Sequence, residues 1–114
     1  MIASGFYQVV FVVRAPGAVG AVGVVIVDGE TVRGGDDQHL YAGALKEAGG
    51  KVTATIRVKP LTAHTTSVFG TRGDAFELTL TGNVDAEGFS VSGPSPVGGA
   101  GISIRGRRVA GLDL

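Results

Sequence analysis

Apolar and polar residues alternate with a period of two along several stretches of this chain. The alternation is clearest in residues 51–59 and 74–81, where apolar side chains occupy every second position. A period of two is typical of a β-strand with one buried side and one side facing solvent. The side chains that we expect to face inward are Val52, Ala54, Ile56, Val58, Phe76, Leu78 and Leu80.

Residues 5–14 and 19–27 differ from this pattern because they are apolar on both faces. A strand of this kind is buried on both sides, or one of its sides contacts another protein. Cover by the segment 60–72 of the same chain would remove that side from water equally well. The face of the first strand that we assign to a dimer interface consists of Tyr7, Val9, Phe11 and Val13.

Turn signals separate the strands. Asp28-Gly29 lies between valine-rich segments and predicts a two-residue hairpin turn with positive φ at both positions. Residues 35–40 and 60–72 are polar, and we expect loops there, the first with at most one helical turn. Further strands are expected at residues 30–33, 41–47 and 88–93, around Ile102 and Ile104, and at 109–112, where the last one would close the sheet.

About eight short strands with short connections, and no convincing long helix, predict an all-β protein. Sequential strands favour antiparallel pairing, and closure of the sheet removes exposed edges. We therefore expect residues 1–114 to form a single small antiparallel up-and-down β-barrel, with two packed sheets as the alternative. A barrel of about eight strands is filled by its side chains or holds one small ligand.

Composition limits the compartment and the partners. The chain has 114 residues and no cysteine, which excludes disulfides and thiolate metal sites and favours a reducing, cytoplasmic setting. Ten Lys and Arg balance ten Asp and Glu, so no electrostatic footprint for nucleic acid or an anionic membrane is expected. The N-terminus lacks the features of a signal peptide, and the apolar runs are too short for a membrane-spanning helix.

Candidate metal ligands are few. His39 and His64 both lie in segments expected to be polar loops, and Asp36 and Asp37 are close to His39 in sequence. A zinc site needs three or four protein ligands in fixed geometry. A solvated loop explains these residues more simply, so we expect no metal and no other cofactor.

No catalytic constellation is present in the sequence. Ser103 lies in Ile-Ser-Ile, a strand pattern that lacks the flanking glycines of a nucleophile elbow. Asp74 and Glu77 are three positions apart on an expected strand, which places them on opposite faces. Arg105, Arg107 and Arg108 form a basic cluster without aromatic neighbours, which suggests a charged edge strand. We therefore expect a protein that is not an enzyme.

The first half of the chain, residues 5 to about 58, resembles the GrlR family of small negative regulators associated with type III secretion. Two features that carry the resemblance are the apolar strand that opens with Gly5-Phe6-Tyr7 and the strand 20–27 with its Asp28-Gly29 hairpin. The others are Gly34-Gly35-Asp36, Tyr41, Gly43 and Leu45, of which Gly-Gly-Asp followed by Tyr-x-Gly is the most specific.

This resemblance implies a calycin- or lipocalin-like barrel that forms a homodimer and represses by holding a transcriptional activator, without reading DNA itself. In that family an acidic run between the fourth and fifth strands contacts the activator. Here the corresponding residues are Lys46-Glu47-Ala48-Gly49-Gly50. The resemblance thus places partner binding at Glu47, with Lys46 and Gly49 beside it. The alternative function is a carrier or sensor of a small apolar ligand, whose cavity the five Phe and two Tyr could line.

Overall fold

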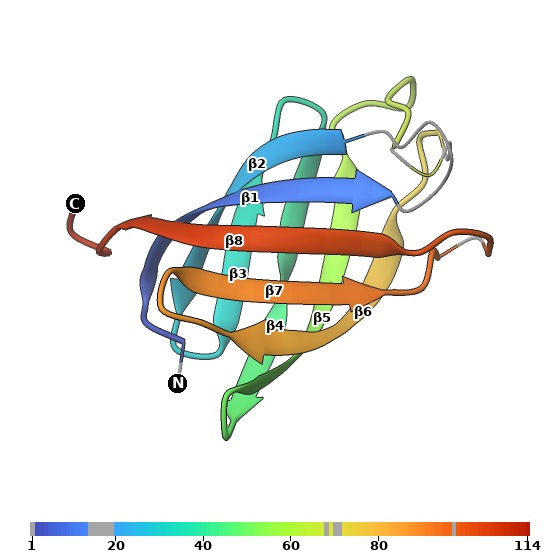
Figure 1. Cartoon of the computed structure of the whole chain (residues 1–114). Coiled ribbons are helices and arrows are strands. Elements are labelled where there is room, and N and C mark those ends of the chain that lie inside the picture. Colours follow the sequence, from blue (N-terminus) through green and yellow to red (C-terminus); the bar gives the residue numbers. More distant parts are fainter. Residues whose placement is uncertain (1, 14–19, 68, 70–71, 97) are drawn as a thin grey trace.

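Eight antiparallel strands form one closed barrel in the computed structural model, which describes residues 2–13, 20–67, 69, 72–96 and 98–114 (Figure 1). The strands follow one another around the barrel in chain order, so the predicted all-β up-and-down architecture is confirmed. No helix occurs in the described part of the chain, and none there could span a membrane. The strands are β1 (Gly5–Val13), β2 (Gly20–Asp28), β3 (Thr31–Gly35), β4 (His39–Ala48), β5 (Lys51–Pro60), β6 (Phe76–Val84), β7 (Gly88–Gly93) and β8 (Ile102–Ala110).

Closure of the barrel depends on the pairing of β1 with β8. Val9 lies opposite Gly106 and Val13 lies opposite Ile102, while the other edge of β1 pairs with β2. Every strand thus has two hydrogen-bonded neighbours, and the alternative of two packed sheets is wrong. The predicted charged edge strand at Arg105 is wrong for the same reason, because β8 pairs on both sides.

Side chains that alternate inward from the strands form the core. The inward positions predicted for residues 51–59 and 74–81 are confirmed, and Phe89, Val91, Ile102 and Ile104 also lie in the core. Ala54, Ile56 and Phe76 are only partly buried and pack against the fully buried residues. The fully buried apolar side chains are Ile2, Tyr7, Val9, Val25, Val27, Val32, Tyr41, Leu45, Val52, Val58, Leu78, Leu80, Phe89, Val91, Ile102 and Ile104.

One face of strand β1 is buried in the barrel, and the other face is exposed. Tyr7 and Val9 are only 2% and 1% exposed, and Phe11, on the same face, packs against the core. Val13 follows on this face at the end of the strand and is half-buried. Side chains that form the barrel interior cannot also contact a second copy, so this face is not the dimer interface that the sequence predicted.

The outer face of β1 carries the exposed apolar side chains instead. Val10 and Val12 are 40% and 39% exposed, and Val22 and Val24 of the neighbouring strand are 57% and 48% exposed. Val10 lies directly opposite Val22 in the β1–β2 pair. Because these four valines remain exposed, the described residues of segment 60–72 do not cover this face as the alternative prediction required. We call Val10, Val12, Val22 and Val24 the outer valine patch.

Several predicted boundaries shift by a few residues. Strand β8 runs without interruption to Ala110, so no separate strand exists at 109–112. Strand β3 continues through Gly34 and Gly35, and β4 begins at His39, which leaves only 36–38 of the predicted 35–40 loop. The β2–β3 hairpin is present, but Gly29 and Glu30 form its turn, and only Gly29 has positive φ.

Two glycines make room for aromatic rings inside the barrel. A Cβ at Gly106 would lie 2.3 Å from the ring of Phe89, its cross-strand partner on β7. A Cβ at Gly23 would lie 3.3 Å from the ring of Tyr41. Glycines inside strands commonly mark such close approaches.

Candidate ligand-binding cavity

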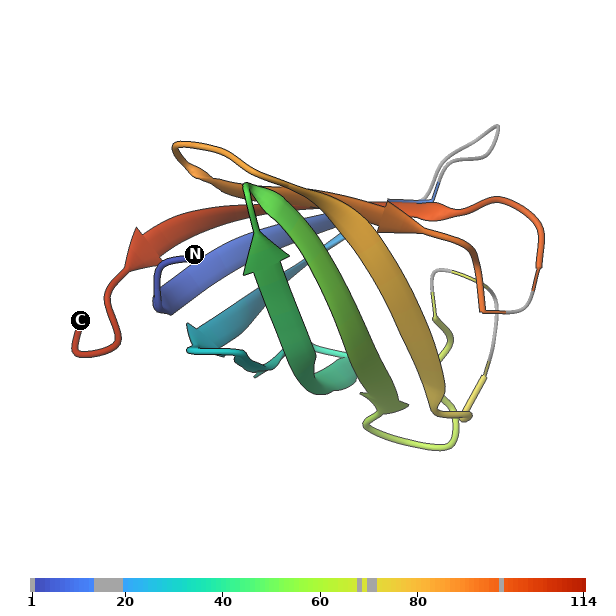
Figure 2. The same ribbon diagram turned by 90° about the horizontal axis from the view of Figure 1, so that it is seen from below.

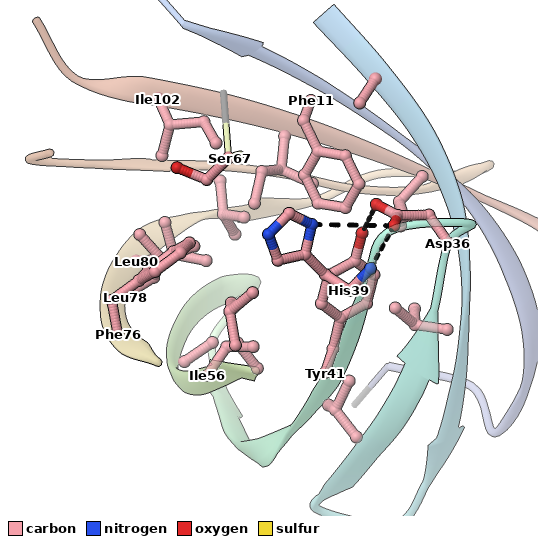
Figure 3. A pocket seen from close by; sticks show the side chains of 18 of the residues that line it. Phe11, Asp36, His39, Tyr41, Ile56, Ser67, Phe76, Leu78, Leu80 and Ile102 are labelled. Carbon is pink, nitrogen blue, oxygen red and sulfur yellow. Dashed lines mark hydrogen bonds and ion pairs between the residues drawn. The ribbon is translucent and has the colours of Figure 1, made fainter. Parts of the chain in front are cut away.

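The inward side chains do not fill the barrel. A cavity of about 200 Å³ lies inside it, and residues from all eight strands contribute to its walls (Figure 3). The apolar wall consists of Ile2, Val9, Phe11, Ala21, Val25, Val27, Val32, Leu45, Val52, Ala54, Ile56, Val58, Phe69, Phe76, Leu78, Leu80, Phe89, Val91, Ile102 and Ile104. Barrels of eight strands are just wide enough to enclose one small ligand.

The polar residues that line the cavity in the described part of the chain gather at one end. They come from the β3–β4 loop, the start of β4 and the segment between β5 and β6, which lies at the end of the barrel away from the C-terminus (Figures 1 and 2). Asp37, Gln38 and Thr66 line the cavity and are also exposed, so the cavity reaches the surface at this end.

Asp36 organises the polar end. Its side chain is only 9% exposed, and Oδ1 accepts hydrogen bonds from the backbone N–H groups of Gln38 and His39, both at 2.7 Å. Oδ2 accepts a hydrogen bond from the hydroxyl of Tyr41. The N–H of Asp36 in turn donates to the carbonyl of His39 at 3.0 Å. A buried carboxylate needs such donors to offset the loss of its hydration.

Tyr41 is held in its protonated form. Burial raises the pKa of its hydroxyl strongly, and the hydrogen bond to Asp36 and the negative charges of Asp36 and Asp37 raise this pKa further. The phenol therefore remains a hydrogen-bond donor throughout the physiological pH range. Gly23 leaves the space that this ring occupies.

His39 is the polar side chain that points into the cavity. It is 8% exposed, and its Nδ1 lies 3.9 Å from Oδ1 of Asp36 (Figure 3). The ring stands edge-on to Phe76, with centroids 6.3 Å apart and an interplanar angle of 65°. Figure 3 shows the other ring nitrogen, Nε2, directed away from Asp36 into the cavity. The prediction that His39 lies in a solvated loop is therefore wrong, whereas His64 is exposed as expected.

Two aromatic pairs line the cavity, and Phe76 of one pair also contacts His39. Phe11 and Tyr41 pack edge to face at 5.4 Å and 61°, and Phe69 and Phe76 do so at 5.6 Å and 88°. Aromatic pairs prefer this geometry because the positive edge of one ring meets the negative face of the other. These rings offer flat apolar surfaces against which a planar ligand can pack.

The cavity wall carries no side chain of Lys or Arg among the described residues. Within the described ranges, the titratable side chains in the wall are the carboxylates of Asp36 and Asp37, the imidazole of His39 and the phenol of Tyr41. Within the described residues, no three His, Cys, Asp or Glu side chains come together as a metal site would require.

The residues predicted to bind an activator lie at the opposite end of the barrel. Lys46, Glu47 and Gly49 belong to the β4–β5 hairpin, whereas His39 begins β4 (Figure 1). Oε2 of Glu47 accepts a hydrogen bond from the N–H of Gly50 at 3.0 Å, within the turn. The structure thus brings these residues together, and it separates them from the cavity.

The sequence prediction missed the Asp36, His39 and Tyr41 group. A usable signal was present, since His39 and Tyr41 are two positions apart and Leu40 between them is exposed, as a strand alternating from residue 39 requires. The segment was instead interpreted as a loop because Gly34 and Gly35 suggested that the preceding strand had ended.

Fold and site together define an eight-stranded up-and-down β-barrel with an internal, largely apolar cavity that is polar at one end. No protein-family model matches this chain, and comparison with curated proteins finds no match either. Similarity to the GrlR family therefore stays a prediction from the sequence.

Proposed function

We propose that this protein binds a small, largely apolar molecule inside its barrel and acts as a carrier or a sensor of it. The observation that carries the proposal is the unfilled interior, a cavity of about 200 Å³ with an almost wholly apolar wall. Protein interiors are otherwise packed as densely as organic crystals. An apolar cavity of about 150 Å³ is known to stay dry and to bind benzene, so this one has room for a larger ring system.

The test is binding of naphthalene, followed by isothermal titration calorimetry, in the wild type and in two matched variants. Ala54→Phe places a ring in the cavity, because Ala54 lines it. Ala44→Phe places the same ring on the outer face of the adjacent strand, where Ala44 is exposed. We expect binding to the wild type and to Ala44→Phe, and loss of binding in Ala54→Phe. Equal binding by all three proteins would place the ligand outside the barrel and contradict the proposal.

The homodimer predicted from the sequence is retained as a second proposal, on a different face. The outer valine patch favours it, because four exposed valines on adjacent strands form a larger apolar surface than scattered single side chains do. A dimeric mass by light scattering, and a monomeric one for Val22→Lys, would support it. A monomeric wild type at high micromolar concentration would exclude it.

Repression of a transcriptional activator in the cytoplasm remains a prediction from the family resemblance. The structure supports it only in that Lys46, Glu47 and Gly49 share one hairpin. Capture of a DNA-binding regulator by the wild type, but not by Glu47→Lys, would support this function. It would be compatible with ligand binding, since the hairpin and the polar end of the cavity lie at opposite ends of β4.

A further inference from the structure

We propose that the ligand carries a neutral hydroxyl group, as a phenol or an aromatic alcohol does, and that this hydroxyl donates a hydrogen bond to Nε2 of His39. This inference rests on the proposed function and specifies the chemistry of the guest. It begins from His39, a buried side chain whose Nε2 faces the cavity (Figure 3). Nδ1 of His39 lies 3.9 Å from Oδ1 of Asp36, which is longer than a hydrogen bond.

The negative charge of Asp36, on the Nδ1 side of the ring, gives the two ring nitrogens of His39 different surroundings. In a neutral imidazole one nitrogen is a donor and the other an acceptor. A carboxylate beside Nδ1 favours the proton there, which leaves the lone pair on Nε2 as an acceptor. Nε2 points into the cavity, so the ligand is expected to supply a donor (Figure 3).

A backbone hydrogen bond and a ring contact restrict where the imidazole can lie. The backbone N–H of His39 is bonded to Asp36, and the ring packs against Phe76. The carboxylate of Asp36 is itself fixed by Gln38 and Tyr41. A preorganised acceptor gains affinity because little side-chain entropy is lost when the ligand binds.

An anionic head group fits this wall poorly. No Lys or Arg lines the cavity in the described chain, and the two carboxylates of Asp36 and Asp37 would repel a ligand carboxylate. Burying an unpaired charge in an apolar site costs far more than burying a neutral hydroxyl that finds a partner. Fatty acids and aromatic carboxylates are therefore disfavoured in comparison with neutral ligands of the same size.

The two carboxylates would attract an ammonium group, but the hydrogen-bond acceptors of this end match it less well than they match a hydroxyl. The carboxylate of Asp36 already accepts three hydrogen bonds from the protein, from two backbone N–H groups and one phenol. Nε2 offers a single acceptor, which matches one hydroxyl better than an ammonium with three donors. The rings of Phe11, Phe69 and Phe76 complete the site with surfaces suited to a planar apolar body.

The test compares three probes that share one ring system, naphthalene, 2-naphthol and 2-naphthoate, by isothermal titration calorimetry at near-neutral pH. We expect 2-naphthol to bind about tenfold more tightly than naphthalene, the effect of about one net hydrogen bond. We expect 2-naphthoate to bind more weakly than naphthalene. Equal affinities of naphthol and naphthalene, or tightest binding by naphthoate, would overturn the inference.

Two variants locate the effect at His39. His39→Leu removes the acceptor at similar volume and should abolish the preference for naphthol while naphthalene still binds. His39→Gln retains a carbonyl acceptor and should keep part of the preference. If His39→Leu shows no cooperative unfolding transition, the preference for naphthol over naphthalene is compared between His39→Gln and the wild type instead. A preference unchanged in His39→Gln and in His39→Leu would place the hydroxyl elsewhere and refute the assignment.

Failure of this inference is distinguishable from failure of the proposed function. If naphthalene binds but the hydroxyl adds nothing, the cavity is a binding site and only the role of His39 is wrong. If none of the three probes binds, the proposal of a ligand-binding barrel fails, and the inference about the hydroxyl fails with it.

Discussion

The hydroxyl of Tyr41 donates a hydrogen bond to Oδ2 of Asp36. This bond joins the β3–β4 loop, which contains Asp36, to strand β4, which contains Tyr41. Both side chains are buried, and the other oxygen of the carboxylate is occupied by two backbone N–H groups. The bond thus completes the set of donors around a charge that would otherwise be poorly solvated. The shape of the polar end depends on it.

Tyr41→Phe is therefore expected to lower the free energy of unfolding by about 1–3 kcal/mol, because it leaves a buried carboxylate with one donor fewer. Tyr7→Phe is the matched control. The hydroxyl of Tyr7 donates to the carbonyl of Ala3 at 2.6 Å, a neutral acceptor, so we expect a smaller loss of about 1 kcal/mol. Urea denaturation followed by circular dichroism measures both. A smaller loss for Tyr41→Phe than for Tyr7→Phe would show that Asp36 does not depend on this bond.

The two tyrosines also predict a loss of stability at alkaline pH. Burial raises the pKa of Tyr41 and of Tyr7 above the ordinary value of 10.0, with the nearby Arg108 opposing the rise at Tyr7. Above about pH 10 the unfolded chain loses phenolic protons that the folded chain keeps, so the free energy of unfolding falls as pH rises. Below about pH 10 this contribution is fully present.

Absorbance of tyrosinate tests this pH dependence directly, because the chain has only two tyrosines. We expect little tyrosinate absorbance from the folded protein near pH 10, and its appearance together with unfolding at higher pH. Ordinary titration of either tyrosine around pH 10, with the fold intact, would contradict the burial and bonding described above.

Gly106→Ala is expected to destabilise the barrel by about 1–3 kcal/mol, the usual cost of overpacking. The new methyl group would lie 2.3 Å from the ring of Phe89, which also packs against Tyr7 with ring centroids 5.4 Å apart and so has little room to move. Gly111→Ala is the control, since the nearest atom to a Cβ there is 3.4 Å away. Thermal unfolding of both variants is the measurement. Equal stability of the two would mean that Phe89 can be displaced at no cost.

Leu80→Ala and Val24→Ala separate the inner from the outer face. Leu80 is 2% exposed within the core, and its truncation is expected to cost about 2–5 kcal/mol. Val24 is 48% exposed on the outer face of β2, and its truncation is expected to change stability by less than about 0.5 kcal/mol. Denaturant midpoints of the two variants report the difference. A large loss for Val24→Ala would indicate that a partner covers the outer valine patch.

The sequence by itself determined the strands and, where one face is polar, the direction of their side chains. The inward positions of Val52, Val58, Leu78 and Leu80 follow from a period of two, which is a local property of an extended chain. The turn at Gly49 and Gly50 is equally local, since positive φ at both positions favours glycine.

Only the tertiary structure decided which face of β1 is the inside. Both faces are apolar, so the pattern could not distinguish Tyr7 and Val9, which form the core, from Val10 and Val12, which are exposed. The pairing of β1 with β8 settles this, and it joins residues about a hundred positions apart in the chain. The burial of His39 and the cavity beside it arise in the same way. They depend on where eight strands and two loops meet, and no local period encodes that meeting.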